Sequence, residues 1–188
     1  IPVSFPDYAS ESSMLVRMYL RGDFGTQAED VNAYAAAAFF AVDRYASYRM
    51  KWGQAYEHGA IIIADRYTTS NMAHQAVKLT DAGERDAYLD WLYDFEFQKM
   101  GLPMPDAVFF LDMEPDAARH LILARARQKG TVPDIHEQDA AYLARTHAAY
   151  RMLAARYGWV CIPSSQNGRP LPIEEIHERL YEAVRLLL

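Results

Sequence analysis

The sequence predicts a three-layer α/β/α fold in which helices cover both faces of a central parallel sheet. Short apolar runs alternate with longer segments of helical periodicity, which is typical of strand–helix–strand units. The middle two runs are rich in β-branched and aromatic residues with little period-two alternation, as expected of parallel strands covered on both faces. With 188 residues, 51% of them hydrophobic, the chain is long enough for one domain with a sizeable core.

Predicted strands and helices follow one another along the whole chain. Four apolar runs are the candidate strands, and the segments between them repeat apolar residues every three or four positions. The helix after the third run has Pro115 near its first turn and Gly130 as its stop. The expected strands are 1–5, 60–65, 107–112 and 158–163, and the expected helices are 10–21, 28–58, 70–79, 81–101, 114–130, 138–157 and 173–188.

Composition argues against several classes of protein. A net charge of −6 does not indicate a protein that binds duplex nucleic acid, although a few arginines suffice for a small anionic ligand. Cys161 is the only cysteine, which excludes an intrachain disulfide and a CxxC metal site and is typical of the cytoplasm. No apolar run approaches the length of a membrane span, and the first residues lack a signal-peptide pattern.

The end of the second apolar run carries a candidate phosphate site. Open α/β sheets bind ligands at the carboxyl ends of their strands, where Asp65 and Arg66 are expected. Arg66 offers a planar fork of donors suited to a phosphate, and Asp65 suits either that fork or a hydrated magnesium ion. In the alternative, Asp65 and Ser70 cap the next helix and Arg66 is solvated. Spacing alone leaves both interpretations open.

Two further helical segments carry candidate ligand residues. Ser70, Asn71 and His74 share one face of the helix after the second strand, close to the candidate phosphate site. In the long helix, Phe40 and Arg44 lie one turn apart, a spacing that suits an aromatic ring stacked on a base and an arginine bonded to its edge. The alternative is a core phenylalanine with a surface arginine.

A basic helix end follows the third strand. The C-terminal end of this helix contains Arg125, Arg127 and Lys129. Cations at a helix C-terminus interact favourably with the helix dipole, and this alone would explain the three basic residues. Together with the loop after them they also suit a mobile lid that closes on phosphates. His120 has no metal-ligand spacing and is interpreted as a surface or packing residue. The ionisable residues of the loop are Asp134, His136 and Glu137.

Four segments in order resemble the thymidylate kinase family, the P-loop nucleoside monophosphate kinases that make dTDP from dTMP and ATP. They are "FPDY", "FFAVDRYAS", "IIIADRYTTSNMAHQ" and "MPDAVFFLDMEPDAARHLILAR". The third, which resembles the family's Asp-Arg-Tyr-x-x-Ser signature, is the most specific. The resemblance covers nearly the whole chain and implies a single domain, 1–188, with a P-loop NTPase-like nucleotide kinase fold and a lid around 125–137.

The resemblance implies roles at the dTMP side. Phe40 would stack on thymine and Arg44 would bond its edge. Arg66 would hold the dTMP phosphate, with Asp65 close to magnesium. Asp7 departs from an arginine frequent at or beside its position. The other residues implied to contact substrate are Phe5, Tyr8, Ser70, Asn71, His74, His136 and Glu137.

The resemblance also implies an ATP side and a partner. Arg125 or Arg127, in the lid, would reach the transferring phosphoryl group, and Gln166 lies in a loop that corresponds to the family's adenine-side loop. The reaction implied is magnesium-dependent transfer of a phosphoryl group from ATP to dTMP. A homodimer through the long helix 28–58 is expected, since its Ala-rich face, 33–41, permits close helix packing.

The family's Gly-x-x-x-x-Gly-Lys-Ser/Thr loop does not occur in residues 1–188. Phosphoryl transfer in these enzymes depends on that loop for positioning and charge neutralisation. We therefore expect the natural chain to carry about 35 further residues, one strand–loop–helix unit. The alternatives are a truncated, non-catalytic nucleotide-binding protein and a related deoxynucleoside or nucleotide kinase.

Overall fold

The computed structural model describes residues 1–130 and 133–187, without the side chain of Lys129. The chain divides into two compact units, Ile1–Met104 and Pro105–Leu188. Each unit combines helices with a pair of parallel strands, so the predicted α/β class and the parallel pairing are confirmed. Among the described residues, no helix combines the length and apolarity that crossing a lipid bilayer requires.

The first unit contains the parallel strands β1 (Pro2–Ser4) and β2 (Ile63–Asp65), with Val3 opposite Ala64. Within the described residues each strand has one neighbour, so both are edge strands. All three residues of β2 are exposed. The expectation that the second strand is covered on both faces is therefore wrong for this unit, because a two-stranded ribbon offers little surface to bury.

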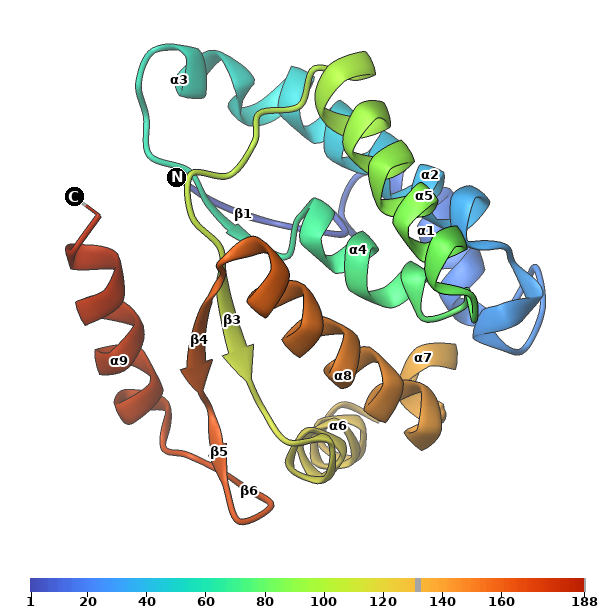
Figure 1. Ribbon diagram of the computed structural model, residues 1–188, viewed down its shortest axis with the longest axis vertical. Helices are drawn as coiled ribbons and strands as arrows, with labels where there is room; N and C mark the ends of the chain where they lie inside the picture. The colour runs from blue at the N-terminus through green and yellow to red at the C-terminus, as the bar shows by residue number, and fades with distance from the viewer. Residues whose placement is uncertain (131–132, 188) are drawn as a thin grey trace. The chain divides into compact units, whose positions relative to one another are not determined.

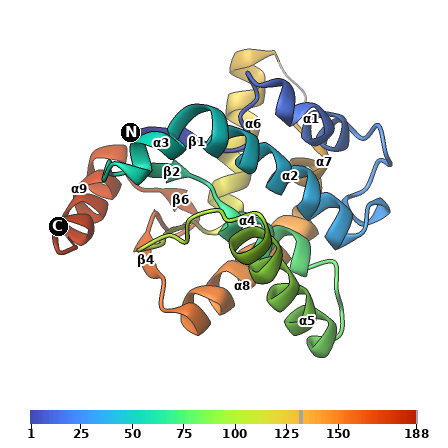
Figure 2. The ribbon, with the colours of Figure 1, turned by 90° about the horizontal axis from the view of Figure 1, so that it is seen from above.

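The helices of the first unit pack around α2, against which α4 and α5 both lie (Figures 1 and 2). The expected helix over 28–58 is interrupted. Asn32 caps α2 by accepting a hydrogen bond from the backbone N–H of Ala35 at 2.9 Å, and a π-helical turn follows α2. The elements are η1 (Glu11–Ser13), α1 (Met14–Arg21), η2 (Ala28–Asp30), α2 (Ala33–Ser47), η3 (Tyr48–Trp52), α3 (Gly53–Glu57), α4 (Thr68–Ala76), α5 (Ala82–Tyr93) and η4 (Asp94–Lys99).

Small side chains allow α2 and α4 to approach closely. Ala36 and Ala37 of α2 and Ala73 of α4 are fully buried. At the end of α4, the Lys78 ammonium donates to the Tyr19 hydroxyl at 2.9 Å and to a backbone carbonyl at 2.8 Å. Burial lowers the pKa of Lys78 to about 8. This lysine therefore joins α4 to α1 inside the unit.

The second unit contains the parallel strands β3 (Phe109–Asp112) and β4 (Val160–Pro163). Helix α8 packs on β3 and α9 on β4 (Figure 1). Helix α6 has Pro115 at its first position and ends at Gly130, whose φ of 62° is left-handed, as the sequence predicts. The other elements are α6 (Pro115–Lys129), α7 (Ile135–Gln138), α8 (Ala140–Tyr157), β5 (Ser165–Gln166), β6 (Arg169–Pro170) and α9 (Ile173–Arg185).

Candidate active site

The junction between β2 and α4 presents an arginine from a strained backbone. Asp65 is the last residue of β2, and Arg66, directly after it, has a φ of 64°. A non-glycine residue in this left-handed region costs roughly 1–2 kcal/mol, and such strain persists mostly at functional positions. The Arg66 side chain is exposed, and its Nη1 lies 3.4 Å from His74 Nε2 of α4. The carboxyl end of β2 thus holds a solvent-accessible guanidinium beside an imidazole.

Capping of the next helix by Asp65 and Ser70 does not match the structure, although Arg66 is exposed as that alternative expects. Helix α4 begins at Thr68, and its N-cap residue is Tyr67, whose side chain makes no capping bond. The Asp65 carboxylate instead accepts a hydrogen bond from Ser4 Oγ at 3.5 Å, across the strand pair. The Tyr67 hydroxyl donates to the Pro103 carbonyl at 2.9 Å, and burial raises the pKa of Tyr67. Asp65 and Arg66 are therefore positioned by the strand end.

A buried polar network, centred on the Glu96 carboxylate, includes residues of α4, the helix that follows this junction. Arg44 of α2 donates to it twice, from Nε to Oε2 at 2.8 Å and from Nη2 to Oε1 at 2.5 Å. Thr68 Oγ1 donates to Oε2 at 2.7 Å, and Asn71 Nδ2 donates to Oε1 at 3.2 Å. Asn71 Nδ2 also donates to the Ala37 carbonyl at 3.0 Å. One carboxylate thus joins α2, α4 and η4.

This network brings together Arg44, which the resemblance assigns to the edge of the base, and Asn71, which it assigns to the substrate site. Both are almost completely buried, so the alternative of Arg44 as a surface residue is wrong. Phe40, one turn before Arg44, is half-buried and packs edge-to-face with Tyr19 at a ring distance of 6.3 Å. The roles of these side chains toward a base stay predictions.

The segment after β1 places its two predicted aromatic residues differently. Phe5 is buried and lies 6.0 Å from the Tyr67 ring, whereas Tyr8 is exposed. The buried Asp43 carboxylate of α2 accepts the backbone N–H of Asp7 at 2.8 Å, which fixes this segment on α2. Phe5 therefore contributes packing next to Tyr67 at the β2–α4 junction, whereas the Tyr8 side chain lies at the surface.

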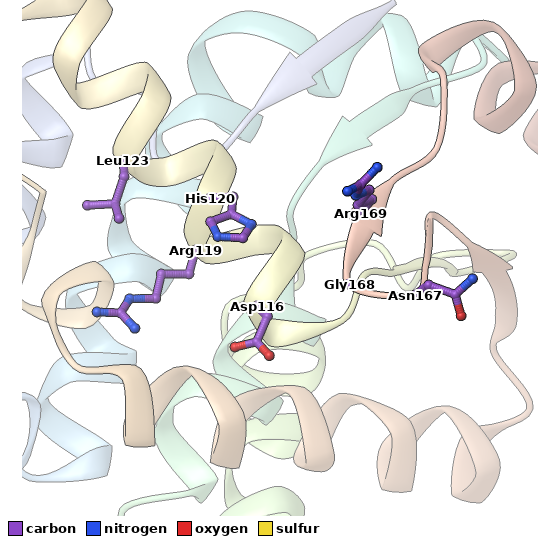
Figure 3. Close-up of a pocket in the computed structure, with 7 residues that line it drawn as sticks. All are labelled: Asp116, Arg119, His120, Leu123, Asn167, Gly168 and Arg169. Carbon is purple, nitrogen blue, oxygen red and sulfur yellow. The ribbon is translucent and has the colours of Figure 1, made fainter.

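A pocket of about 550 Å³ lies in the second unit, between the first turns of α6 and the β5–β6 turn (Figure 3). Glu114 joins the two walls, since its backbone N–H donates to Ser165 Oγ at 2.8 Å and its Oε2 accepts the Gly168 N–H at 2.5 Å. His120, expected to be a surface or packing residue, is exposed and lines this pocket. The lining residues are Asp116, Arg119, His120, Leu123, Asn167, Gly168 and Arg169.

The predicted lid residues are partly engaged with one another. Arg125 of α6 forms an ion pair with Glu137 of α7. Asp134 caps α7 by accepting the backbone N–H groups of His136 and Glu137, each at 2.9 Å. The His136 ring is buried against Tyr142. Arg127 is exposed, whereas the Lys129 side chain and residues 131–132 of the expected lid lie outside the described residues.

The β2–α4 junction offers one exposed carboxylate, that of Asp65, to a metal ion. The described residues contain no group of three or more His, Cys, Asp or Glu side chains that could hold a metal ion. Magnesium seldom needs such a cage, because it usually keeps several waters and binds one or two carboxylates together with substrate phosphates. The exposed Asp65 carboxylate, beside Arg66, meets that requirement.

Sequence reasoning missed Glu96 and most of the pocket in the second unit. A signal for Glu96 exists, since Leu89, Leu92 and Glu96 are spaced as one helical face and the two leucines are buried. An acid that continues an apolar face must find a buried partner. The pocket residues carry no comparable signal, because the β5–β6 turn meets α6 only after folding.

Comparisons with known proteins agree on one family. The sequence model of the thymidylate kinase family matches residues 2–180. The thymidylate kinase of Mycobacterium tuberculosis is 35% identical over 161 residues, which cover 84% of this chain and 72% of that protein. The thymidylate kinase of Synechococcus sp. is 30% identical over 154 residues, 82% of this chain and 63% of that protein. A solved thymidylate kinase structure from Candida albicans, 18% identical, superimposes with a TM-score of 0.64 over 99% of this chain and 79% of that one.

Proposed function

The chain belongs to the thymidylate kinase family, and from this premise we propose that it binds dTMP at the β2–α4 junction and phosphorylates it to dTDP with ATP. The observation that carries this proposal is the exposed, strained Arg66 at the carboxyl end of β2. Its five-donor guanidinium suits a phosphate monoester, which accepts two parallel hydrogen bonds from such a fork. His74, next to Arg66, would then border the sugar, and Ser70 and Tyr8 would border the same site.

The proposed reaction is an in-line displacement. An oxygen of the dTMP phosphate forms a bond to the γ-phosphorus of ATP, the bond from that phosphorus to the β,γ-bridging oxygen breaks, and ADP leaves with the electron pair. The attacking oxygen is already anionic, so no general base is required. Arg66 would orient the attacking phosphate, and Arg125 or Arg127 would offset the charge that develops on the transferring group. Magnesium, held near Asp65, would supply further charge neutralisation when bound.

We assign the pocket at the start of α6 to the ATP side. Arg119 and Arg169 contribute positive charge to it, and Asp116 contributes a hydrogen-bond acceptor. Gln166 precedes the turn that forms one wall and would contact the same nucleotide. Arg119→Ala is expected to weaken ATP binding about 10-fold and to leave dTMP binding unchanged. If calorimetric titration gives the wild-type chain and Arg119→Ala the same ATP affinity, this assignment is contradicted.

The proposed function is tested by calorimetric titration of dTMP, dUMP and dCMP into the 188-residue chain. We expect dTMP to bind in the micromolar range, which is usual for an enzyme substrate, and dCMP to bind much more weakly. Circular dichroism at the same concentration controls for folding. A folded chain that binds none of the three nucleotides would contradict the proposed dTMP site.

The proposed partner is a second copy of the chain, bound through the solvent face of α2. Four of the six alanines in 33–41 are buried inside the first unit, so the face that remains for a partner is the neighbouring one. Val42 and Tyr45 are exposed on it, and Ala38 is partly buried. These side chains recur at i, i+4 and i+7, an apolar stripe of the kind that marks an interaction surface. Helix α2 thus turns a small-residue face inward and an apolar stripe outward.

Light scattering tests this arrangement. The wild-type chain is expected to show twice its 21.5 kDa mass, and Val42→Arg is expected to show the single mass, because burying an unpaired guanidinium in the interface is costly. Ile173→Arg is the matched control, since Ile173 is 80% exposed on α9. A monomeric wild-type chain at working concentration would exclude the dimer.

The proposal includes a cytoplasmic location. Cys161, the single cysteine, is an exposed free thiol. A reducing compartment keeps such a thiol in its reduced form. Recovery of the native protein in a membrane or secreted fraction would contradict this location.

A further inference from the structure

We propose that Glu96 is a positioning residue that sets the substrate class of the base site, by fixing Arg44 as a donor and Asn71 as an acceptor toward a 4-oxopyrimidine. This inference rests on the proposed dTMP site and deepens it. Glu96 is fully buried in the π-helical turn η4, where it touches no solvent. Its effect on a ligand therefore passes through the side chains that it holds.

The orientation of the Asn71 amide follows from its two partners. Both the Glu96 carboxylate and the Ala37 carbonyl can only accept hydrogen bonds, and both lie within bonding distance of the same Asn71 atom, at 3.2 and 3.0 Å. That atom must therefore be Nδ2, and its two hydrogens are both used. Oδ1 is left as the group with which Asn71 meets a ligand, and it can only accept.

The orientation of Arg44 follows in the same way. The carboxylate of Glu96 takes Nε and Nη2, which form one edge of the guanidinium. The opposite edge, at Nη1, is left to meet a ligand, and it can only donate. Thr68 holds the carboxylate from a third direction at 2.7 Å, so Glu96 cannot rotate to release either partner without losing a further bond.

A donor beside an acceptor is complementary to thymine and uracil. Their 4-oxo group accepts a hydrogen bond and their N3–H donates one, whereas cytosine has a donating 4-amino group and an accepting N3. Both cytosine groups would oppose the groups that Glu96 fixes, and a mismatched buried polar pair is strongly rejected. With the carboxylate removed, the Asn71 amide is free to flip and the arginine is free to turn, so discrimination should fall.

The test compares dTMP and dCMP affinities in the wild-type chain, Glu96→Gln, Thr68→Val and Glu84→Gln. We expect the wild type to prefer dTMP over dCMP by at least about 100-fold, and Glu96→Gln to lower that ratio about 10-fold. The affinity for thymidine, which has no phosphate, should fall by the same factor. Glu84→Gln makes the same chemical change on an exposed residue of α5 and should keep the wild-type ratio. Thr68→Val keeps the ion pair and the shape of the side chain, and should lower the ratio a few-fold.

The outcomes separate this inference from the proposed function. A wild-type chain that does not bind dTMP refutes the proposed dTMP site itself. A selective wild type whose ratio is unchanged in Glu96→Gln overturns the inference and leaves Glu96 a purely structural residue, even where the variant's melting temperature is lower. If circular dichroism shows that Glu96→Gln does not fold, Thr68→Val decides: a lowered ratio supports the inference, and an unchanged ratio overturns it.

Discussion

Replacing Arg66 with glycine is expected to lower the affinity for dTMP by about 10- to 100-fold while leaving the chain at least as stable as the wild type. The loss corresponds to one charge-assisted hydrogen bond from a guanidinium to a phosphate, worth about 1.5–3 kcal/mol. Stability should rise by up to about 1 kcal/mol, because glycine adopts the φ of 64° without a steric cost. Arg66→Ala should lose the same affinity but keep the strain.

Two measurements on each variant check this prediction, dTMP affinity by calorimetry and the urea midpoint by Trp fluorescence. Thymidine serves as the control ligand, since its binding should not change when the phosphate contact is removed. Arg21→Ala serves as the control variant, since Arg21 is an exposed arginine paired with Asp23. Unchanged dTMP binding in a folded Arg66→Gly chain would exclude Arg66 as the phosphate ligand, and a lower urea midpoint would show that the left-handed backbone carries no strain.

Much of the fold could be predicted from local sequence pattern. The ends of α6 were predictable because Pro115 and Gly130 act through their own backbone geometry. The π-helical turn at 48–52 was not, because the long Ala-rich stretch contains no proline and its periodicity continues through the break. The exposure of β2 could not be predicted from local sequence pattern either, since an apolar run shows which residues suit burial but not which neighbouring elements cover them.

The candidate site also contains residues that local sequence pattern predicts and residues that depend on tertiary contacts. Asp65 and Arg66 could be placed from the sequence because they directly follow an apolar run, and strand ends carry ligands in this class of fold. Glu96 could not be assigned a role, because its main partner, Arg44, lies 52 residues away and the pairing depends on how α2 meets η4. The roles that all three are given toward dTMP stay predictions until the titrations above are made.

The largest change in stability is expected where the buried ion pair is broken on one side. Glu96→Leu removes the carboxylate and leaves the Arg44 guanidinium, which is 2% exposed, without its counter-charge. Breaking a buried pair in this way costs about 3–5 kcal/mol, a large part of the total stability of a typical domain. The urea midpoint should fall accordingly, with an unchanged slope if the unfolded state is unaffected.

Restoring the balance of polar groups should recover most of that stability. In the triple variant Arg44→Met, Thr68→Val and Glu96→Leu, two of the three side chains that donate to the carboxylate are replaced, and Asn71 loses its bond to the carboxylate but keeps its bond to the Ala37 carbonyl. Well-packed apolar residues often replace a buried ion pair at no net cost, so the triple variant should be markedly more stable than Glu96→Leu alone. It should also lose selective dTMP binding, because both groups that meet the base edge are lost or released. Recovered stability with lost selectivity would mean that the network is retained for recognition. A triple variant as unstable as Glu96→Leu would mean that the network is retained for the fold.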